Sequence, residues 1–195
     1  MNTLKNTAKN YGSVARWIHW LTAVLFLASY TAVYYRQWFT DKDTPENWIS
    51  LQLHLSIGIT ILVLVLLRIL WRWQNRQPDP EPGSRLAHMA AHAGHYLLYA
   101  IMIIMPVTGY LGTGVNTEYF FLFDIPKFET TAVFQSLVAD GMELTFKEFE
   151  KPLDFFHKKI MGEWLVWLLI LGHAGAAMYH HFIRKDRTLM KMTTG

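Results

Sequence analysis

The sequence predicts an all-α integral membrane protein, a four-helix bundle with both termini in the cytoplasm. Of its 195 residues 52% are hydrophobic, and four apolar segments approach the length that crosses about 30 Å of hydrocarbon. Lipid offers the backbone no hydrogen-bond partner, and the alternation typical of a membrane β-barrel is absent, so each segment is expected to be a helix. The segments are apolar on all sides rather than along one stripe, which argues against a soluble bundle.

The expected spans lie in a single domain that covers residues 1–195. They are residues 14–36, 48–71, 86–112 and 160–183. Arg16 and His19 interrupt the start of the first apolar run, which is also too long for the core of a cleavable signal peptide. We therefore expect the first span to remain in the protein.

The three links between these spans differ in character. Residues 37–47 form a short polar turn, and residues 74–85 form a Pro-rich turn that cannot continue a helix. Residues 113–153 are too long for a turn, and links of this length are often functional. At the end of this link, the stretch EKPLDFFHKKIMGEW is expected to be an interfacial helix that leads into the fourth span.

Lysine and arginine set the predicted orientation, because cytoplasmic segments carry an excess of both. The link at 37–47 and its border hold only Arg36 and Lys42, so this side is expected outside. The pI of about 9.1 then reflects topology and needs no nucleic-acid partner. The basic residues expected in the cytoplasm are Lys5, Lys9, Arg16, Arg72, Arg76, Arg85, Arg184, Lys185, Arg187 and Lys191.

Histidines inside the apolar spans are the main functional signal, because imidazole is costly to place in hydrocarbon unless something binds it. By helix rise, His54 and His157 fall in an outer layer, and His19 and His173 fall in an inner layer. Two pairs at two depths suit two bis-histidine haems, each held by neutral imidazoles from two helices. Because cysteine is absent, iron–sulfur clusters and covalent haem attachment are excluded.

The spans resemble the bacterial cytochrome b561 family of four-helix dihaem membrane proteins, related to the b-type subunits of hydrogenases and formate dehydrogenases. The matching stretches are RWIHWL, HLSIGITILVLVLLRILWR, LAHMAAHAGHYLLYAIMIIMPVTGYL and HAGAAMYHHFIRKDRTLMKM. The chain is most similar to the superoxide oxidase branch, whose members pass electrons from external superoxide to ubiquinone. The resemblance implies two haem b groups, one on His19 and His173 and one on His54 and His157. It also implies a multi-pass protein of the bacterial inner membrane, surrounded by lipid.

Two spacings fit this assignment poorly in a regular α-helix. His157 and His173 are sixteen residues apart, about 4.4 turns, so an irregularity is expected between them. Gly162, an unwound lead-in after Pro152 or a π-bulge could supply it. Depth alone favours His180 over His173 as the inner partner of His19. We favour His173 because of the resemblance and because small neighbours leave room for a flat porphyrin, namely Gly172, Ala174, Gly175, Ala176 and Ala177.

Three further histidines, His88, His92 and His95, lie on one face of the third span. With Arg85 they are expected to bind haem propionates or a quinone at the cytoplasmic end, and the alternative is that the histidines only face water there. Their i, i+4, i+7 spacing also suits zinc, but no glutamate completes a zincin motif, so zinc is less favoured.

Lys158 and Lys159 are the candidate catalytic residues, because a cationic patch beside the His157 haem would steer superoxide. Against this, the 113–153 link carries seven acids and three lysines, and a net negative link repels an anion. Two alternatives stay open: a cytochrome b subunit that links a dehydrogenase or hydrogenase to quinone, and a histidine-lined metal transporter. The brief tail after Arg184 favours a stand-alone oxidoreductase.

Overall fold

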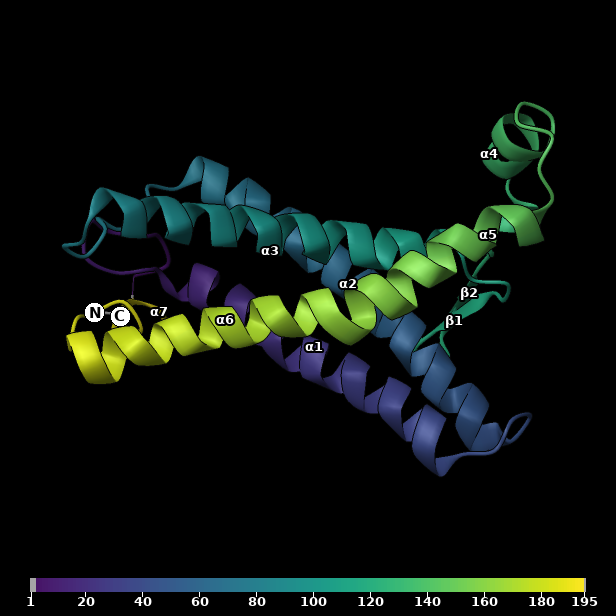
Figure 1. Ribbon diagram of the computed structural model, residues 1–195, viewed down its shortest axis with the longest axis horizontal. Helices are drawn as coiled ribbons and strands as arrows, with labels where there is room; N and C mark the ends of the chain where they lie inside the picture. Colours follow the sequence, from purple (N-terminus) through teal and green to yellow (C-terminus); the bar gives the residue numbers. More distant parts are fainter. Residues whose placement is uncertain (1–2, 195) are drawn as a thin grey trace.

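The computed structural model describes residues 3–194, in which four helical stretches are long enough to span a membrane. Figure 1 shows these stretches side by side, with both chain ends at one end of the bundle. The stretches are α1 (Ser13–Phe39), α2 (Pro45–Gln74), α3 (Arg85–Leu111) and a last one over Phe146–Arg184. All four are long and apolar enough to cross a membrane, which confirms the predicted all-α membrane bundle. We call the end that carries the termini the inner end and the opposite one the outer end.

The first three helices agree with the expected spans to within three residues. Side-chain caps set two of their starts, since the Thr44 hydroxyl accepts from the Asn47 N–H and the Ser84 hydroxyl accepts from the Ala87 N–H. The last stretch begins fourteen residues before the span expected from 160, because the helix expected over EKPLDFFHKKIMGEW is continuous with that span and starts earlier, at Phe146. A capping box between Thr145 and Glu148 starts the helix there and satisfies backbone N–H groups of its first turn.

This last helical stretch alternates between α and π geometry. It consists of α5 (Phe146–Phe155), the π-helix η3 (Phe156–Leu165), α6 (Val166–Met178) and a second π-helix, η4 (Tyr179–Arg184). The irregularity expected between His157 and His173 is therefore a π-helix of ten residues.

The 113–153 link contains structure that the sequence analysis does not predict. Strands β1 (Thr117–Tyr119) and β2 (Phe123–Ile125) form an antiparallel hairpin that packs on α2. The link continues through η1 (Phe128–Thr130), α4 (Ala132–Phe134) and η2 (Gln135–Ala139). In Figure 1 this second part stands away from the bundle, whereas the hairpin lies beside α2.

Two small clusters of apolar side chains hold the helices together. Ile57, Ile61 and Val65 of α2 pack with Met102 of α3. Ile101, Met161 and Val166 join α3 to the last helical stretch. Many other large apolar side chains on the four helices face outward, as expected where lipid surrounds the protein.

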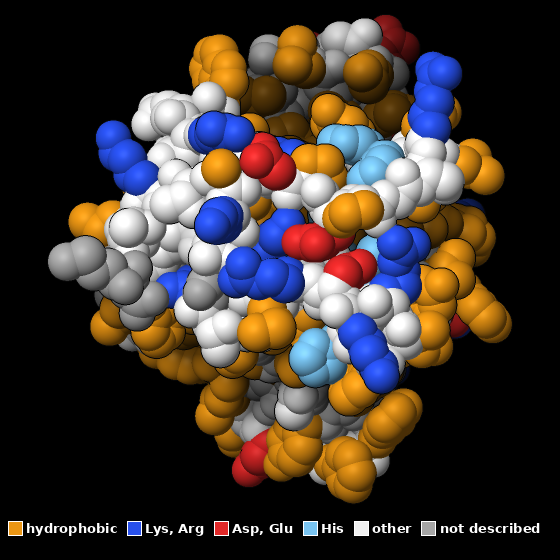
Figure 2. All heavy atoms as spheres, turned by 90° about the vertical axis from the view of Figure 1, so that its left-hand side faces the viewer, with side chains coloured by type: hydrophobic (Ala, Val, Ile, Leu, Met, Phe, Trp, Pro, Cys, Tyr) orange, Lys and Arg blue, Asp and Glu red, His pale blue; other side chains and the backbone are white. Residues whose placement is uncertain are grey.

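The inner end is closed by three chain segments that bind one another. Lys191, in α7 (Met190–Thr193), is buried and pairs with Glu81 of the α2–α3 link. Its Nζ also donates to the carbonyl of Asp79 at 2.7 Å, and the Asp79 N–H donates to the carbonyl of Ala8 at 2.8 Å. Figure 2 looks onto this end, where many Lys and Arg side chains surround a few acidic ones.

Candidate functional site

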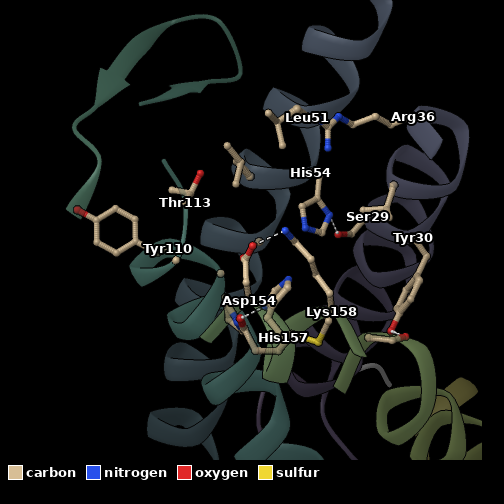
Figure 3. Close-up of a pocket in the computed structure, with 18 of the residues that line it drawn as sticks. Ser29, Tyr30, Arg36, Leu51, His54, Tyr110, Thr113, Asp154, His157 and Lys158 are labelled. Atoms are coloured by element: carbon tan, nitrogen blue, oxygen red, sulfur yellow. Dashed lines mark hydrogen bonds and ion pairs between the residues drawn. The ribbon is translucent and has the colours of Figure 1, made fainter. Parts of the chain in front are cut away.

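His54 of α2 and His157 of η3 face each other toward the outer end of the bundle. Their ring centroids are 6.2 Å apart and the ring planes are inclined by 80°. Figure 3 shows both rings in the same cavity. An imidazole–metal bond is about 2 Å long, so two rings on one metal ion have centroids about 6 Å apart. This outer pair therefore fits an iron held between two histidines.

Hydrogen bonds hold both rings by Nδ1. His157 Nδ1 donates to the Met105 carbonyl at 2.9 Å; because a carbonyl accepts only, Nε2 of neutral His157 carries no proton. His54 Nδ1 lies 2.8 Å from the Ser29 hydroxyl, which can accept from it in the same way. In this tautomer Nε2 of each ring is the nitrogen left to bind a metal.

The outer pair lines a cavity of about 450 Å³. A Cβ added at Gly109 would lie 2.9 Å from Cε1 of His157, so this wall admits the ring because residue 109 is glycine. A Cβ added at Gly58 would meet nothing within 4 Å, which leaves room for a flat macrocycle. The cavity also has charged lining residues: Arg36, Glu150, Asp154, Lys158 and Glu163.

His19 of α1 and His173 of α6 form a second, inner pair, with ring centroids 6.1 Å apart and planes inclined by 70°. His95 of α3 joins them, since its ring centroid lies 5.8 Å from that of His173. Arg68 Nη1 lies 3.0 Å from His19 Nδ1. A guanidinium donates only, so neutral His19 carries its proton on Nε2 while this hydrogen bond is present.

Small residues leave open space around the inner pair. Gly172 and Gly175 flank His173, and Gly94 precedes His95. A Cβ added at any of these three glycines would meet no atom within 4 Å. The His173 side chain is exposed on this open side, so the inner pair also has the clearance that a porphyrin needs.

The π-helix η3 brings His157 and His173 onto one face of the last helical stretch. A π-helix bonds residue i to i+5 and turns about 80° per residue, against about 100° in an α-helix. Eight of the sixteen steps from His157 to His173 fall in η3 and eight lead into and through α6. Together they make about four full turns, so both rings lie on one face of the stretch, where His157 meets His54 and His173 meets His19.

The two candidate lysines differ in position. Lys158 lines the outer cavity, as Figure 3 shows, whereas Lys159 lies outside that lining. Lys158 pairs with Asp154 at 2.5 Å and Lys159 pairs with Glu163 at 2.6 Å. Acidic partners therefore balance the expected cationic patch.

The other candidates on α3 lie toward the inner end. His95 contacts the inner pair, whereas the His88 ring lies beside Gly83, and His92 and Arg85 are exposed. Within residues 3–194, no group of three or more His, Cys, Asp or Glu side chains is arranged to hold a metal ion.

His180 is engaged elsewhere than at the inner pair. Its Nδ1 bonds the Asp186 carboxylate, which also lies 3.5 Å from Nε of Arg184. Burial alone raises the pKa of Asp186, but hydrogen bonds from His180 and Thr188 lower it to about 2. These contacts fix the turn that follows η4.

Two groups that position the outer pair are not among the residues predicted from the sequence. Ser29 is a small polar residue in an apolar span, which is a signal for a buried partner. The Met105 group is a backbone carbonyl, which every residue has, so the residue type at position 105 does not predict this hydrogen bond.

Four membrane-length helices that bring histidines together in pairs at two levels define a membrane cytochrome of the b type. The family model described as prokaryotic cytochrome b561 matches residues 10–195. The chain is 31% identical to cytochrome b561 homolog 2 of Escherichia coli K12, over 96% of this chain and 93% of that protein. It is 26% identical to cytochrome b561 homolog 1 of the same organism, over 90% and 92% of the two chains. The chain belongs to the prokaryotic cytochrome b561 family and is a membrane electron-transfer protein that binds haem b.

Proposed function

We propose that this protein carries electrons from superoxide at its outer face to ubiquinone, through two b-type haems in the bacterial inner membrane. The supporting observation is the presence of two histidine pairs, with ring centroids 6.2 Å and 6.1 Å apart. His54 and His157 would hold the outer haem, and His19 and His173 the inner one. A bound haem supplies reversible one-electron chemistry at each level.

Residues around the pairs orient these ligands. The Met105 carbonyl and the Ser29 hydroxyl hold the outer rings by Nδ1 and leave Nε2 for the iron. At the inner pair, Arg68 has to give up its hydrogen bond to His19 before Nε2 of that ring is free. Its guanidinium is then available to a haem carboxylate beside the same ring.

The outer cavity offers an anion two cationic side chains, Arg36 and Lys158. Each superoxide gives one electron and leaves as O₂, and two of them supply the two electrons that ubiquinone takes up with two protons. Three acids share the same lining, so net charge does not draw the anion in. Attraction depends instead on where the two cations lie relative to the outer pair.

The proposal assigns ubiquinone reduction to the inner end. His95 contacts the inner pair, and Arg85, His88 and His92 follow toward the start of α3. These side chains can donate hydrogen bonds to a quinone carbonyl and lie on the side from which cytoplasmic protons would arrive. His88→Ala or His92→Ala with both haems retained and quinone reduction lost would support this location. Normal turnover in both variants would refute it.

The experiment that tests the function adds superoxide to purified, oxidised protein and follows haem and ubiquinone absorbance. Both haems are expected to become reduced and ubiquinol to appear, and superoxide dismutase is expected to stop both changes. Haems that dithionite reduces but superoxide does not would refute superoxide as the donor, while leaving the family assignment intact.

The role of Lys158 in attracting superoxide can be tested with one variant at Lys158 and a matched control at Lys147. Lys158→Gln is expected to slow haem reduction by superoxide a few-fold at low salt, because the lost charge lies in the cavity lining. Lys147→Gln removes an equal charge from an exposed position of α5 outside that lining, and the rate is expected to stay the same. Stopped-flow absorbance measures both rates. Equal rates in both variants would contradict a role for Lys158.

A second function, electron transfer for a partner dehydrogenase or hydrogenase, has one observation in its favour. The part of the link that stands away from the bundle exposes Val133, Leu137 and Met142, which are apolar. Such residues outside the membrane can mark a contact with another protein. Purification in mild detergent distinguishes the two functions, because this one requires a stoichiometric dehydrogenase to accompany the chain.

A further inference from the structure

The hairpin of the 113–153 link has an apolar end bounded by two acidic residues. Glu118 on β1 lies opposite Asp124 on β2, and Tyr119 lies opposite Phe123. Residues 119–123, which we call the apolar turn, read YFFLF and form the end of the hairpin beyond the two carboxylates. Glu118 and Asp124 are therefore the last charged residues before the turn, and all five residues between them have apolar or aromatic side chains.

Three side chains of the apolar turn are exposed at the surface. Phe121 is 50% exposed, Leu122 is 78% exposed and Phe123 is 57% exposed. Phe120 and Phe121 have φ of 47° and 61°, the left-handed region that tight hairpins normally fill with Asn and Gly. Two phenylalanines in these positions make the turn costly in backbone energy and give it a large apolar surface.

Contacts with α2 place the apolar turn well inside the outer end of the bundle. The Trp48 indole donates to the Glu118 carboxylate at 3.1 Å, and tryptophan commonly marks the headgroup level. The Phe120 N–H donates to the hydroxyl of Ser56 at 2.9 Å. Ser56 lies eight residues beyond Trp48 toward the inner end, about 12 Å of helix rise, and a helix tilt of about 40° still leaves about 9 Å of depth.

Deeper contacts agree with this position. The Tyr119 hydroxyl lies 2.9 Å from that of Thr60, one turn beyond Ser56. Phe120 packs against the core cluster of α2 and α3. Past Thr60, the same face of α2 continues with Val63 and Leu67, which are exposed and apolar. The outward side of the apolar turn is therefore continuous with a helix face of the kind that lipid covers.

The backbone of the turn is suited to a medium without water. The Phe121 N–H donates to the Glu118 carbonyl at 3.1 Å, and the Leu122 N–H donates to the Tyr119 carbonyl at 3.0 Å. With the Phe120 N–H on Ser56, three successive donors of the turn have protein acceptors. Non-helical backbone at membrane depth is tolerated where protein surrounds it, and here protein acceptors take up these three N–H groups while the side chains of Phe121, Leu122 and Phe123 project outward.

We propose that the apolar turn is a membrane anchor that inserts among the acyl chains of the outer leaflet. Glu118 and Asp124 then mark the level at which the hairpin meets water and headgroups. The anchor fixes one wall of the outer cavity, because Val115 and Thr117, just before the turn, line it. This inference concerns lipid contact and holds whichever molecule donates electrons.

Because the chain contains no cysteine, a cysteine introduced at one position is the only site that a thiol-specific spin label can modify. Leu122→Cys and Asp124→Cys would each be spin-labelled in the haem-loaded protein in lipid vesicles. Collisions of the label with oxygen, which concentrates in lipid, and with a water-soluble nickel complex are then compared. Leu67→Cys provides a reference inside the bilayer, and Asp140→Cys on the outlying part of the link provides a reference in water.

The label at 122 is expected to resemble that at 67, with an oxygen-to-nickel collision ratio several-fold above that of the label at 124. The label at 124 is expected to resemble that at 140. Phe123→Cys gives a second measurement in the turn, and the haem spectrum shows that each variant is folded. A label at 122 that the nickel complex reaches as freely as at 140 would overturn the proposal and make the turn a water-exposed surface.

Discussion

At the scale of single residues, the two histidine pairs differ in which ring nitrogen carries the proton. The Met105 carbonyl keeps the proton of His157 on Nδ1, so Nε2 is ready to bind iron. Arg68 has the opposite effect on His19, because it donates to Nδ1. In the proposed haem arrangement the outer pair can bind iron without rearrangement, whereas the inner pair requires Arg68 to move.

The first ligand prediction concerns the number of haems in alanine variants. His54→Ala and His157→Ala are each expected to lose the outer haem, and His19→Ala and His173→Ala the inner one. Iron that keeps only one of two protein ligands in an apolar site is weakly held, so haem per chain should fall from two to one. A pyridine haemochrome assay gives the count. Two low-spin haems in any of these variants would contradict the pairing.

A second prediction separates His173 from His180. His180→Ala is expected to keep both haems, because the His180 ring bonds Asp186 after η4 while His173 faces His19. Reduced-minus-oxidised spectra of His173→Ala and His180→Ala, measured side by side, check this. If His180→Ala lost the inner haem and His173→Ala kept it, His180 would be the partner of His19, as depth along the helix alone predicts.

The sequence predicts the candidate ligands but not the groups that position them. His19, His54 and His173 stand out because each interrupts an apolar run. The role of the Met105 carbonyl has no such signal, since it depends on which backbone group the folded helix turns toward His157. The acidic partners of Lys158 and Lys159 follow the ordinary i, i+4 spacing and could have been read from the sequence.

At the scale of elements, the π-helix η3 places the two proposed ligands His157 and His173 on one face of the last helical stretch. Deletion of Ile160, an exposed residue of η3, is expected to convert part of it to α-helix and rotate His157 away from His54. The variant should lose the outer haem and keep the inner one, because α6 follows the deletion as an intact helix. Ile160→Ala is the matched control and should keep both haems. Retention of both haems in the deletion variant would show that the π geometry is dispensable.

Long elements are predictable from the sequence and the short ones in the link are not. α1, α2 and α3 each follow from a sustained apolar run. β1 and β2 have three residues each, too few for a periodic pattern, and their turn holds Phe120 and Phe121 where Asn and Gly would signal a hairpin. The hairpin forms because Gln52 and Ser56 of α2 bond its backbone, which no local pattern reveals.

At the scale of the whole molecule, the direction of electron flow depends on which end faces the cytoplasm. Both ends of the chain lie at the end where Lys and Arg gather, and the hairpin lies toward the other end (Figures 1 and 2). The outer cavity is on the side of the hairpin, because Thr117 of β1 lines it. The excess of basic residues predicts that the inner end is cytoplasmic. Under the proposed function, superoxide would then be oxidised at the outer side of the membrane, and quinone protons would come from the cytoplasm.

Single cysteines in the cysteine-free chain test this orientation. Asp140→Cys in the outer link and Thr194→Cys near the C-terminus are both exposed. A membrane-impermeant maleimide is expected to label residue 140 in intact spheroplasts and residue 194 only after lysis, because the basic inner end stays in the cytoplasm. Full labelling of both after lysis controls for reactivity. The reverse pattern would place the outer cavity in the cytoplasm, and a superoxide donor would then have to be generated inside the cell.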